Sequence, residues 1–414
     1  MKEHEINKEG GFITNRKKNL YIMWFVNFFV SASITMIVPF LSLYIASLDS
    51  SYSNEFVQRW SGYVFGVTFL TAFLISPIWG RIGDRHGYKK ILLINGIGIA
   101  TSILFMGLVQ TVYQLFALRL FMGLVTGFIS TSMALISAQT EKATAGKTLG
   151  TMQMSNVAGG LFGPLMGGLM ADSVGFIYTF FLTATVIYLS AFVIIIGVKE
   201  QPIQSKEAKR IAYSRKDVLA HILKQPLLVV TMLLTFITQV GNFSIQPLLA
   251  LYIHDLHGSE NLAFFAGLAF SATGLGNLLF TRKWGNLGDR IGHDKVLLAL
   301  LILSSILFIP QALADSYGML VIFRFLYGMT LGGIIPCTTA YIRIKAPASM
   351  QGEVLGYNVS FRFLGNVVGP VIGGIVASHY GIPAVFYVTA VIFLFGALFL
   401  WAVRYHSKTK ERSV

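Results

Sequence analysis

The sequence predicts an all-α integral membrane protein with twelve transmembrane helices arranged as two six-helix repeats. Of the 414 residues, 54% are hydrophobic and only 12% are charged, whereas soluble proteins carry about 25% charged residues. Apolar runs long enough to cross a bilayer follow one another along the chain. Short motifs also return in the second half of the chain, about 205 residues after their first appearance.

The chain is organised around residues 80–92, a glycine-rich and charged stretch between two apolar runs. Asp84 and Arg85 return 205 positions later as Asp289 and Arg290. We expect a tight turn here, because glycine allows backbone conformations and close helix approaches that other residues do not. The candidate gating residues of this turn and its repeat are Gly80, Gly83, Asp84, Arg85, Gly87, Asp289 and Arg290.

A glycine-proline motif also recurs, 206 positions apart. Its residues in the first half are Gly150, Gly159, Gly163, Pro164, Gly167 and Gly168, and in the second half Gly356, Gly365, Gly369, Pro370, Gly373 and Gly374. Glycines at this spacing let two membrane helices pack backbone to backbone, and a proline removes one helical hydrogen bond. The motif predicts a pivot and leak seal, or ordinary small-residue packing, and the two are not exclusive.

The apolar runs give the elements in order. The expected spans are 20–48, 61–80, 91–109, 112–136, 149–171, 176–198, 227–253, 262–281, 296–314, 317–340, 354–378 and 383–403. They form two bundles, 20–198 and 226–403, joined by a polar linker at 199–225, with tails at 1–19 and 404–414. The first run is too long for a signal-peptide core, so we expect it to be retained as a span.

The net charge of +14 is distributed unevenly between the two sides of the predicted membrane. With loops placed alternately, 28 of the 32 Lys and Arg residues fall on the side of the termini, and only Arg59 falls on the other side. This bias places both termini in the cytoplasm of a multi-pass protein. It also explains the basic charge without nucleic-acid binding.

Enzyme chemistry is not supported by any motif. The single cysteine, Cys337, excludes an internal disulfide and a thiolate cluster. His254, Asp255 and His257 lie too close together in the chain to suggest a metal site. We therefore expect no catalytic residues, no metal and no cofactor.

Polar side chains inside the spans mark candidate binding positions. Two groups each fall on one helix face: Gln239, Asn242 and Gln246 in the seventh span, and Asn358, Arg362 and Asn366 in the eleventh. Amides within a bilayer must face protein or water. They predict either a substrate cavity or hydrogen bonds between helices.

Arg119 is a further charged residue within a span, the fourth. A charged side chain at the bilayer centre costs about 2.5–3.5 kcal/mol on insertion scales, so it usually serves a function. A second possibility is that its long side chain reaches the membrane surface.

These motifs resemble those of the major facilitator superfamily. The turn at Asp84 is similar to its loop signature, and residues 150–168 resemble the antiporter signature of its twelve-span drug:proton antiporters. The overall pattern is similar to multidrug efflux pumps of Gram-positive bacteria, whose first span carries a Val-Pro-Phe-type motif like residues 38–44. Ser42 stands here in place of a second proline.

The resemblance implies export of amphipathic drugs, such as fluoroquinolones and dyes, in exchange for protons across the bacterial plasma membrane. It implies that Asp84 gates the transporter, that Asp84 and Arg119 serve proton coupling, and that one chain suffices for function. All 18 Asp and Glu residues lie in loops or at span ends on this map, so the proton-carrying group is not identified. A transporter of the same fold for a metabolite or nutrient is the alternative.

Overall fold

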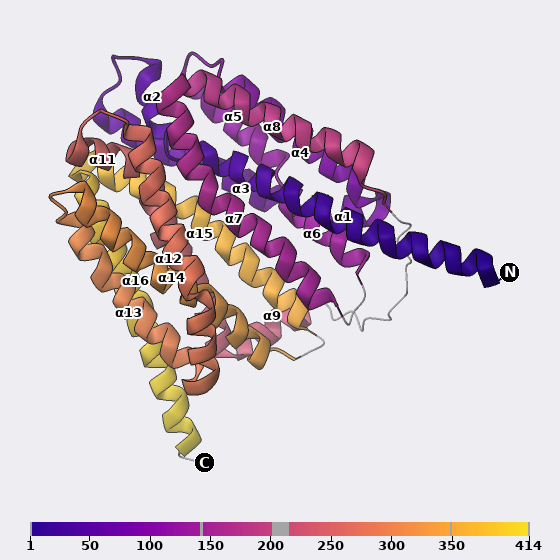
Figure 1. Ribbon diagram of the computed structural model, residues 1–414. Coiled ribbons are helices and arrows are strands. Elements are labelled where there is room, and N and C mark those ends of the chain that lie inside the picture. Colours follow the sequence, from indigo (N-terminus) through magenta and orange to yellow (C-terminus); the bar gives the residue numbers. More distant parts are fainter. Residues whose placement is uncertain (1, 141–143, 201–214, 348–349, 413–414) are drawn as a thin grey trace.

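The computed structural model of the protein describes residues 2–140, 144–200, 215–347 and 350–412, and every element in these ranges is helical (Figure 1). The N-terminal half contains α1 (Lys2–Met36), α2 (Leu41–Leu48), α3 (Asn54–His86), α4 (Tyr88–Met106), α5 (Val112–Leu124), α6 (Phe128–Ala138), α7 (Ala145–Val174) and α8 (Phe176–Gly197). After α9 (Arg215–Lys224), the C-terminal half contains α10 (Pro226–Ser244), η1 (Gln246–Leu248), α11 (Leu249–His257), α12 (Leu262–Ile291), α13 (His293–Ala312), α14 (Tyr317–Lys345), α15 (Gln351–Tyr380) and α16 (Ile382–Arg412).

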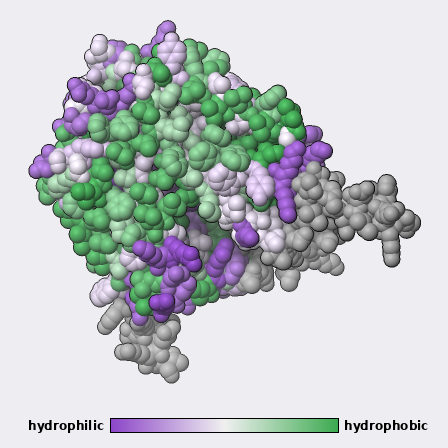
Figure 2. All heavy atoms as spheres, in the orientation of Figure 1, coloured by the Kyte–Doolittle hydropathy of each residue, from purple (hydrophilic) through white to green (hydrophobic). Residues whose placement is uncertain are grey.

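The helices are long enough and apolar enough for a membrane. Within the described ranges, eleven stretches meet the length and hydropathy of a membrane span. Helix α3 lies between the first two of them and has 33 residues, which corresponds to about 50 Å at 1.5 Å per residue. Figure 2 shows a broad hydrophobic surface with hydrophilic groups gathered toward its ends. The protein is therefore an all-α integral membrane protein with twelve transmembrane helices.

The two halves have separate hydrophobic cores and meet along two helix pairs. One core is built from the helices of the N-terminal half together with Ala263 of α12, and the other from helices of the C-terminal half. Between the halves, α3 packs on α15 and α7 packs on α12. Figure 1 shows the halves diverging toward the end of the bundle that carries both termini. We call this the terminal end and the opposite one the closed end.

Three of the expected spans are not single continuous helices. The first breaks between α1 and α2 around Pro39, and the seventh breaks at η1 around Pro247. Proline has no N–H group to donate within a helix. The fourth breaks between α5 and α6, where Gly127 has a φ of 152°. Each of these three expected spans is therefore built from two helical segments.

The expected turn at residues 80–92 is shorter than predicted. Helix α3 continues to His86, and the chain reverses only at Gly87, which has a φ of +95°. The repeat behaves in the same way, since α12 ends before Gly292, with a φ of +101°. Glycine adopts these angles without steric strain. Asp84 therefore lies in the last turn of α3 rather than in a loop.

The linker between the halves is only partly described. Residues 215–224 of the expected polar linker form α9, whereas residues 201–214 lie outside the described ranges. A small cluster that includes Ile222, Leu228 and Ile342 packs α9 against α10 and α14. The division into two bundles at this linker stays a prediction.

Candidate functional site

The glycine-proline motifs bring helix backbones into direct contact within each half. Gly159, Gly163 and Gly167 of α7 face carbonyl groups of Phe28, Ala32 and Met36 in α1, so closely that a Cβ atom would overlap them. The repeat-related Gly365, Gly369 and Gly373 of α15 face Phe236, Val240 and Ser244 of α10 in the same way. The small residues therefore allow α1 and α7, and likewise α10 and α15, to pack at close range.

The last glycine of each motif faces the other half of the protein. Gly168 of α7 lies against Ala263 of α12, and Gly374 of α15 lies against Gly62 of α3. The motif therefore contributes both to the packing within a half and to the contact between the halves.

The two interfaces between the halves are related by the sequence repeat. Gly66 of α3 faces the carbonyl oxygen of Val367, where a Cβ would lie 3.1 Å from it. At the repeat-related place, Ser271 of α12 donates a hydrogen bond of 2.7 Å to the carbonyl oxygen of Leu161. Residues at equivalent repeat positions therefore form the contacts at both interfaces.

Toward the terminal end the halves do not touch at the corresponding motif positions. A Cβ atom placed on Gly150, the first glycine of the motif in α7, or on Gly356 in α15 would have no neighbouring atom within 4 Å. Val359 and Arg362 of α15 are exposed there. Leu364 and Ile375 are also exposed, but at 100° per residue they lie on roughly the opposite side of the helix. We assign Leu364 and Ile375 to the lipid side and Arg362 to the opening between the halves.

The two predicted polar faces adjoin. Gln239 of α10 is 2% exposed and packs directly against Gly365 of α15, beside Asn366. Asn358 and Asn366 are each 7% exposed, and their Oδ1 atoms have no hydrogen-bond partner among the described residues. Their neighbour Arg362 is exposed, and none of the ion pairs among the described residues involves it. We call Gln239, Asn242, Asn358, Arg362 and Asn366 the polar strip.

Two members of the predicted seventh-span face have different surroundings. Asn242 accepts a long hydrogen bond of 3.5 Å from the Tyr327 hydroxyl. Gln246 lies in η1, which contacts α3 and α15. The helix break before η1 removes Gln246 from the regular spacing of α10, so the structure does not align it with the rest of the strip.

Two buried arginines occupy repeat-related positions. Arg119 in α5 and Arg324 in α14 are 6% and 2% exposed. In each, Nε and Nη2 have no hydrogen-bond partner among the residues that the structure describes. The Arg119 guanidinium carbon lies 5.6 Å from the ring centre of Phe65, and that of Arg324 lies 5.9 Å from Phe386. An aromatic face attracts a cation at such distances. Of this pair, only Arg119 was predicted from the sequence to have a role, although Arg324 occupies the equivalent position in the repeat.

The candidate gating residues lie at the terminal end. Gly83 packs against Tyr88, whereas a Cβ atom placed on Gly80 would meet no atom outside its own helical turn within 4 Å. Arg85 and Arg290 are exposed. The Asp84 side chain lies outside what the structure describes, so its expected contact with the start of the eleventh span stays a prediction. In the repeat, Asp289 Oδ1 lies 3.2 Å from His293 Nε2.

Glu200 contributes to this region and was missed by sequence analysis, which placed it in the linker. Its carboxylate accepts hydrogen bonds from the backbone N–H groups of Tyr88 and Lys89 at the start of α4. Lys89 Nζ in turn donates to the carbonyl oxygen of Val198, at 2.7 Å. A carboxylate is favourable at a helix N-terminus because the free N–H groups there carry partial positive charge. These contacts fix the end of α8 to the start of α4.

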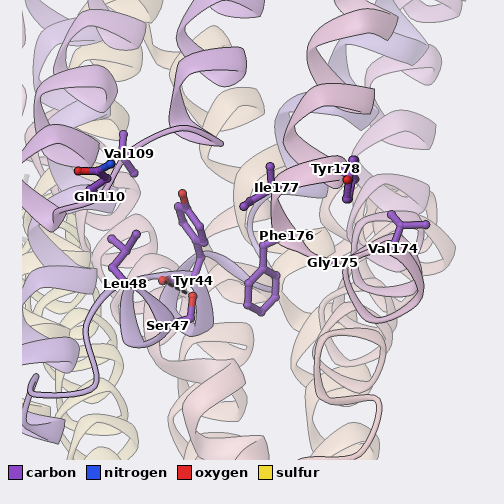
Figure 3. A pocket seen from close by; sticks show the side chains of 10 residues that line it. All are labelled: Tyr44, Ser47, Leu48, Val109, Gln110, Val174, Gly175, Phe176, Ile177 and Tyr178. Atoms are coloured by element: carbon purple, nitrogen blue, oxygen red, sulfur yellow. Dashed lines mark hydrogen bonds between the residues drawn. The ribbon is translucent and has the colours of Figure 1, made fainter.

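A pocket of about 500 Å³ opens at the closed end of the N-terminal half (Figure 3). It is lined by Tyr44, Ser47, Leu48, Val109, Gln110, Val174, Gly175, Phe176, Ile177 and Tyr178. Tyr44 is held by a hydrogen bond of 2.8 Å from its hydroxyl to the carbonyl oxygen of Met106. All of these residues belong to one half and none belongs to the polar strip, so we do not assign substrate transport to this pocket.

Twelve spans in two repeats, which meet at one end and part at the other, are the architecture of a membrane transporter. The Major Facilitator Superfamily profile matches residues 23–259 and 231–414. The chain belongs to the Major Facilitator Superfamily, and it is a transport protein and not an enzyme.

Relatives of known sequence and structure agree with this assignment. The Bacillus subtilis (strain 168) protein named "Uncharacterized MFS-type transporter YuxJ" is 65% identical over 382 residues, covering 92% of this chain and 97% of the relative. "Multidrug resistance protein MdtG" of Enterobacter lignolyticus (strain SCF1) is 40% identical over 389 residues, covering 93% and 92%. A bacterial homolog of the human lysosomal transporter Spinster, solved in an inward-facing, unoccupied conformation, shares the fold with a TM-score of 0.78 at 14% identity, covering 94% and 96%.

Proposed function

We propose that the protein exports amphipathic drugs from the bacterial cytoplasm in exchange for protons, by alternating access. The observation that carries this proposal is the polar strip at the opening between two halves that contact each other through glycine-rich helices. Relatives named multidrug resistance proteins, at 38–40% identity over most of the chain, support the drug substrates. The alternative is a transporter of this superfamily for a metabolite or nutrient.

The orientation follows from charge. Lys and Arg residues concentrate in the loops of the terminal end, and such loops remain in the cytoplasm. The opening between the halves then faces the cytoplasm, and the closed end faces the outside. In this orientation the structure is the inward-facing state, from which a cytoplasmic drug is collected.

The residues take different parts in the proposed cycle. The polar strip binds substrate, with Arg362 receiving an anionic group such as a drug carboxylate. Arg119 serves proton coupling, and Asp84 gates the terminal end and takes part in coupling. Both interfaces and the whole strip come from one chain, which supports a functional monomer.

A substrate panel in inside-out membrane vesicles tests the proposal. The panel contains ethidium, a zwitterionic fluoroquinolone, and sugars, nucleosides and amino acids as nutrients. Under an imposed pH gradient, acid inside the vesicles, we expect accumulation of the drugs and none of the nutrients. Accumulation of a nutrient without the drugs supports the alternative. If neither the drugs nor the nutrients accumulate, the proposal is contradicted.

A further inference from the structure

The closed end holds a charged contact between the halves that the glycine packing does not require. Asp172 lies in the last turn of α7, in the N-terminal half. Its carboxylate accepts hydrogen bonds from the backbone N–H groups of Ala263, at 3.2 Å, and of Phe264, at 2.7 Å. Both donors lie in the first turn of α12, in the C-terminal half. We call this contact the interhalf cap.

Helix α12 has no side-chain cap of its own. The residue before it, Asn261, has left-handed backbone angles of φ 48° and ψ 37°, and its side chain makes no capping hydrogen bond. The first N–H groups of a helix lack partners within the helix, and they favour a negatively charged acceptor. Asp172 supplies that acceptor from the other half of the protein.

The second interface lacks this contact. The repeat position of Asp172, 206 residues later, is Ser378. Its hydroxyl donates to the carbonyl oxygen of Ile375 in its own helix, at 2.9 Å. The helix corresponding to α12 is α3, and it is capped by its own Ser53, which accepts from Phe56 N at 3.3 Å. The glycine contacts are thus shared by both interfaces, whereas the charged cap is present at one.

The interhalf cap must break if the halves separate at the closed end. Gly168, one turn before Asp172, lies against the Ala263 backbone, so movement of α12 away from α7 removes both contacts together. Hydrogen bonds to a charged acceptor are stronger than those between neutral groups. The cap therefore stabilises the conformation that is closed at this end relative to one that is open there.

We propose that Asp172 sets the balance between these two conformations, as the residue that holds the closed end shut until α12 moves. The proposal concerns this conformational equilibrium and needs no substrate. It is consequently testable even where the drug proposal fails.

Distance measurements across the closed end test the interhalf cap. The sole cysteine, Cys337, is buried, and Cys337→Ser gives a cysteine-free background. Nitroxide labels at Gln110→Cys and Ser316→Cys then report on opposite halves, at two exposed positions of the closed end. The distance distribution is measured by pulsed electron paramagnetic resonance on the full chain in lipid nanodiscs.

We expect Asp172→Ala to raise the ratio of long to short distances roughly tenfold, as expected for loss of hydrogen bonds to a charged group. Asp172→Asn, which keeps one acceptor oxygen but loses the charge, should give a smaller shift. The matched control is Asp315→Ala, because Asp315 is an exposed acidic residue at the same end and should leave the distribution unchanged.

Folding is checked by the thermal unfolding of each labelled protein. An unchanged distribution in folded Asp172→Ala overturns the proposal, as does an equal shift in Asp315→Ala. If Asp172→Ala does not fold, the distance distribution of Asp172→Asn is used instead. A wild-type distribution in Asp172→Asn also overturns the proposal.

Discussion

Gly267 of α12 lies so close to Pro164 of α7 that a Cβ atom on Gly267 would overlap the proline carbonyl group. The other interface repeats this relationship, since Gly62 of α3 lies against the carbonyl group of Pro370 in α15. Gly62 and Gly267 are 205 positions apart, and the two prolines are 206 apart. The pseudo-symmetry of the sequence is thus present in the atomic contacts that join the halves.

Gly163→Leu should abolish drug efflux while leaving the protein in the membrane. A larger side chain would overlap Thr35 and Ala32 of α1, and overpacking of this kind costs about 1–3 kcal/mol. Resistance to ethidium and membrane levels of the protein are measured together. The matched control is Gly160→Leu, since a Cβ atom on Gly160 would meet no atom of another helix within 4 Å and the change should be tolerated. Wild-type resistance in Gly163→Leu at normal levels would show that close packing is unnecessary at this position.

Arg362→Gln should weaken transport of carboxylate drugs roughly tenfold and spare permanent cations such as ethidium. The guanidinium can bind a carboxylate through two charge-assisted hydrogen bonds, which an amide cannot replace. Initial rates for a fluoroquinolone and for ethidium are compared in vesicles. Arg362→Lys is the matched variant, because it keeps the charge and loses the paired geometry. An equal loss for both drug classes would assign Arg362 a structural or coupling role instead.

Asp84→Asn should lower the turnover number of transport more than it weakens substrate binding. The change keeps the shape of the side chain but removes the charge expected to face the N-terminal end of the eleventh span. Binding is followed by fluorescence of a bound dye, and turnover by vesicle uptake. Asp289→Asn is the matched change in the repeat and should have the smaller effect, since Asp289 faces His293. Wild-type turnover in Asp84→Asn would remove Asp84 from the mechanism.

Arg119→Gln should abolish accumulation against a gradient and leave drug exchange intact. Loss of a coupling residue uncouples proton movement from drug movement but does not remove the substrate site. The comparison is between pH-driven uptake and energy-independent exchange of labelled drug. Arg324→Gln is the matched change, at the repeat-related and similarly buried position. If both variants lose both activities equally, the two arginines are structural.

Local sequence patterns predicted the spans and the repeat because these depend on residue type alone. Apolar length gives the spans, and the offset of the glycine-proline motifs gives the two halves and the close contacts at Gly163 and Gly369. The helix breaks around Pro39 and Pro247 coincide with proline, which interrupts helical hydrogen bonding.

Other features depend on residues that are distant in the chain. The Asp172 carboxylate accepts hydrogen bonds from backbone groups 91 and 92 positions away, and the Glu200 carboxylate from groups 111 and 112 positions away. These long separations follow no helical or strand repeat in the sequence. Neither contact could therefore be predicted from the sequence. The polar strip could be predicted as two separate faces, but the packing of Gln239 against Gly365 required the fold.

The most direct test of proton-driven export is drug uptake into inside-out vesicles whose pH gradient is imposed and whose ATP is removed. We predict that ethidium accumulates under the gradient without ATP, and that a protonophore releases it. Uptake should also acidify the medium outside, in amounts that follow the drug transported. Ethidium uptake that requires ATP at a clamped pH gradient, or that persists unchanged after the protonophore, would contradict the account.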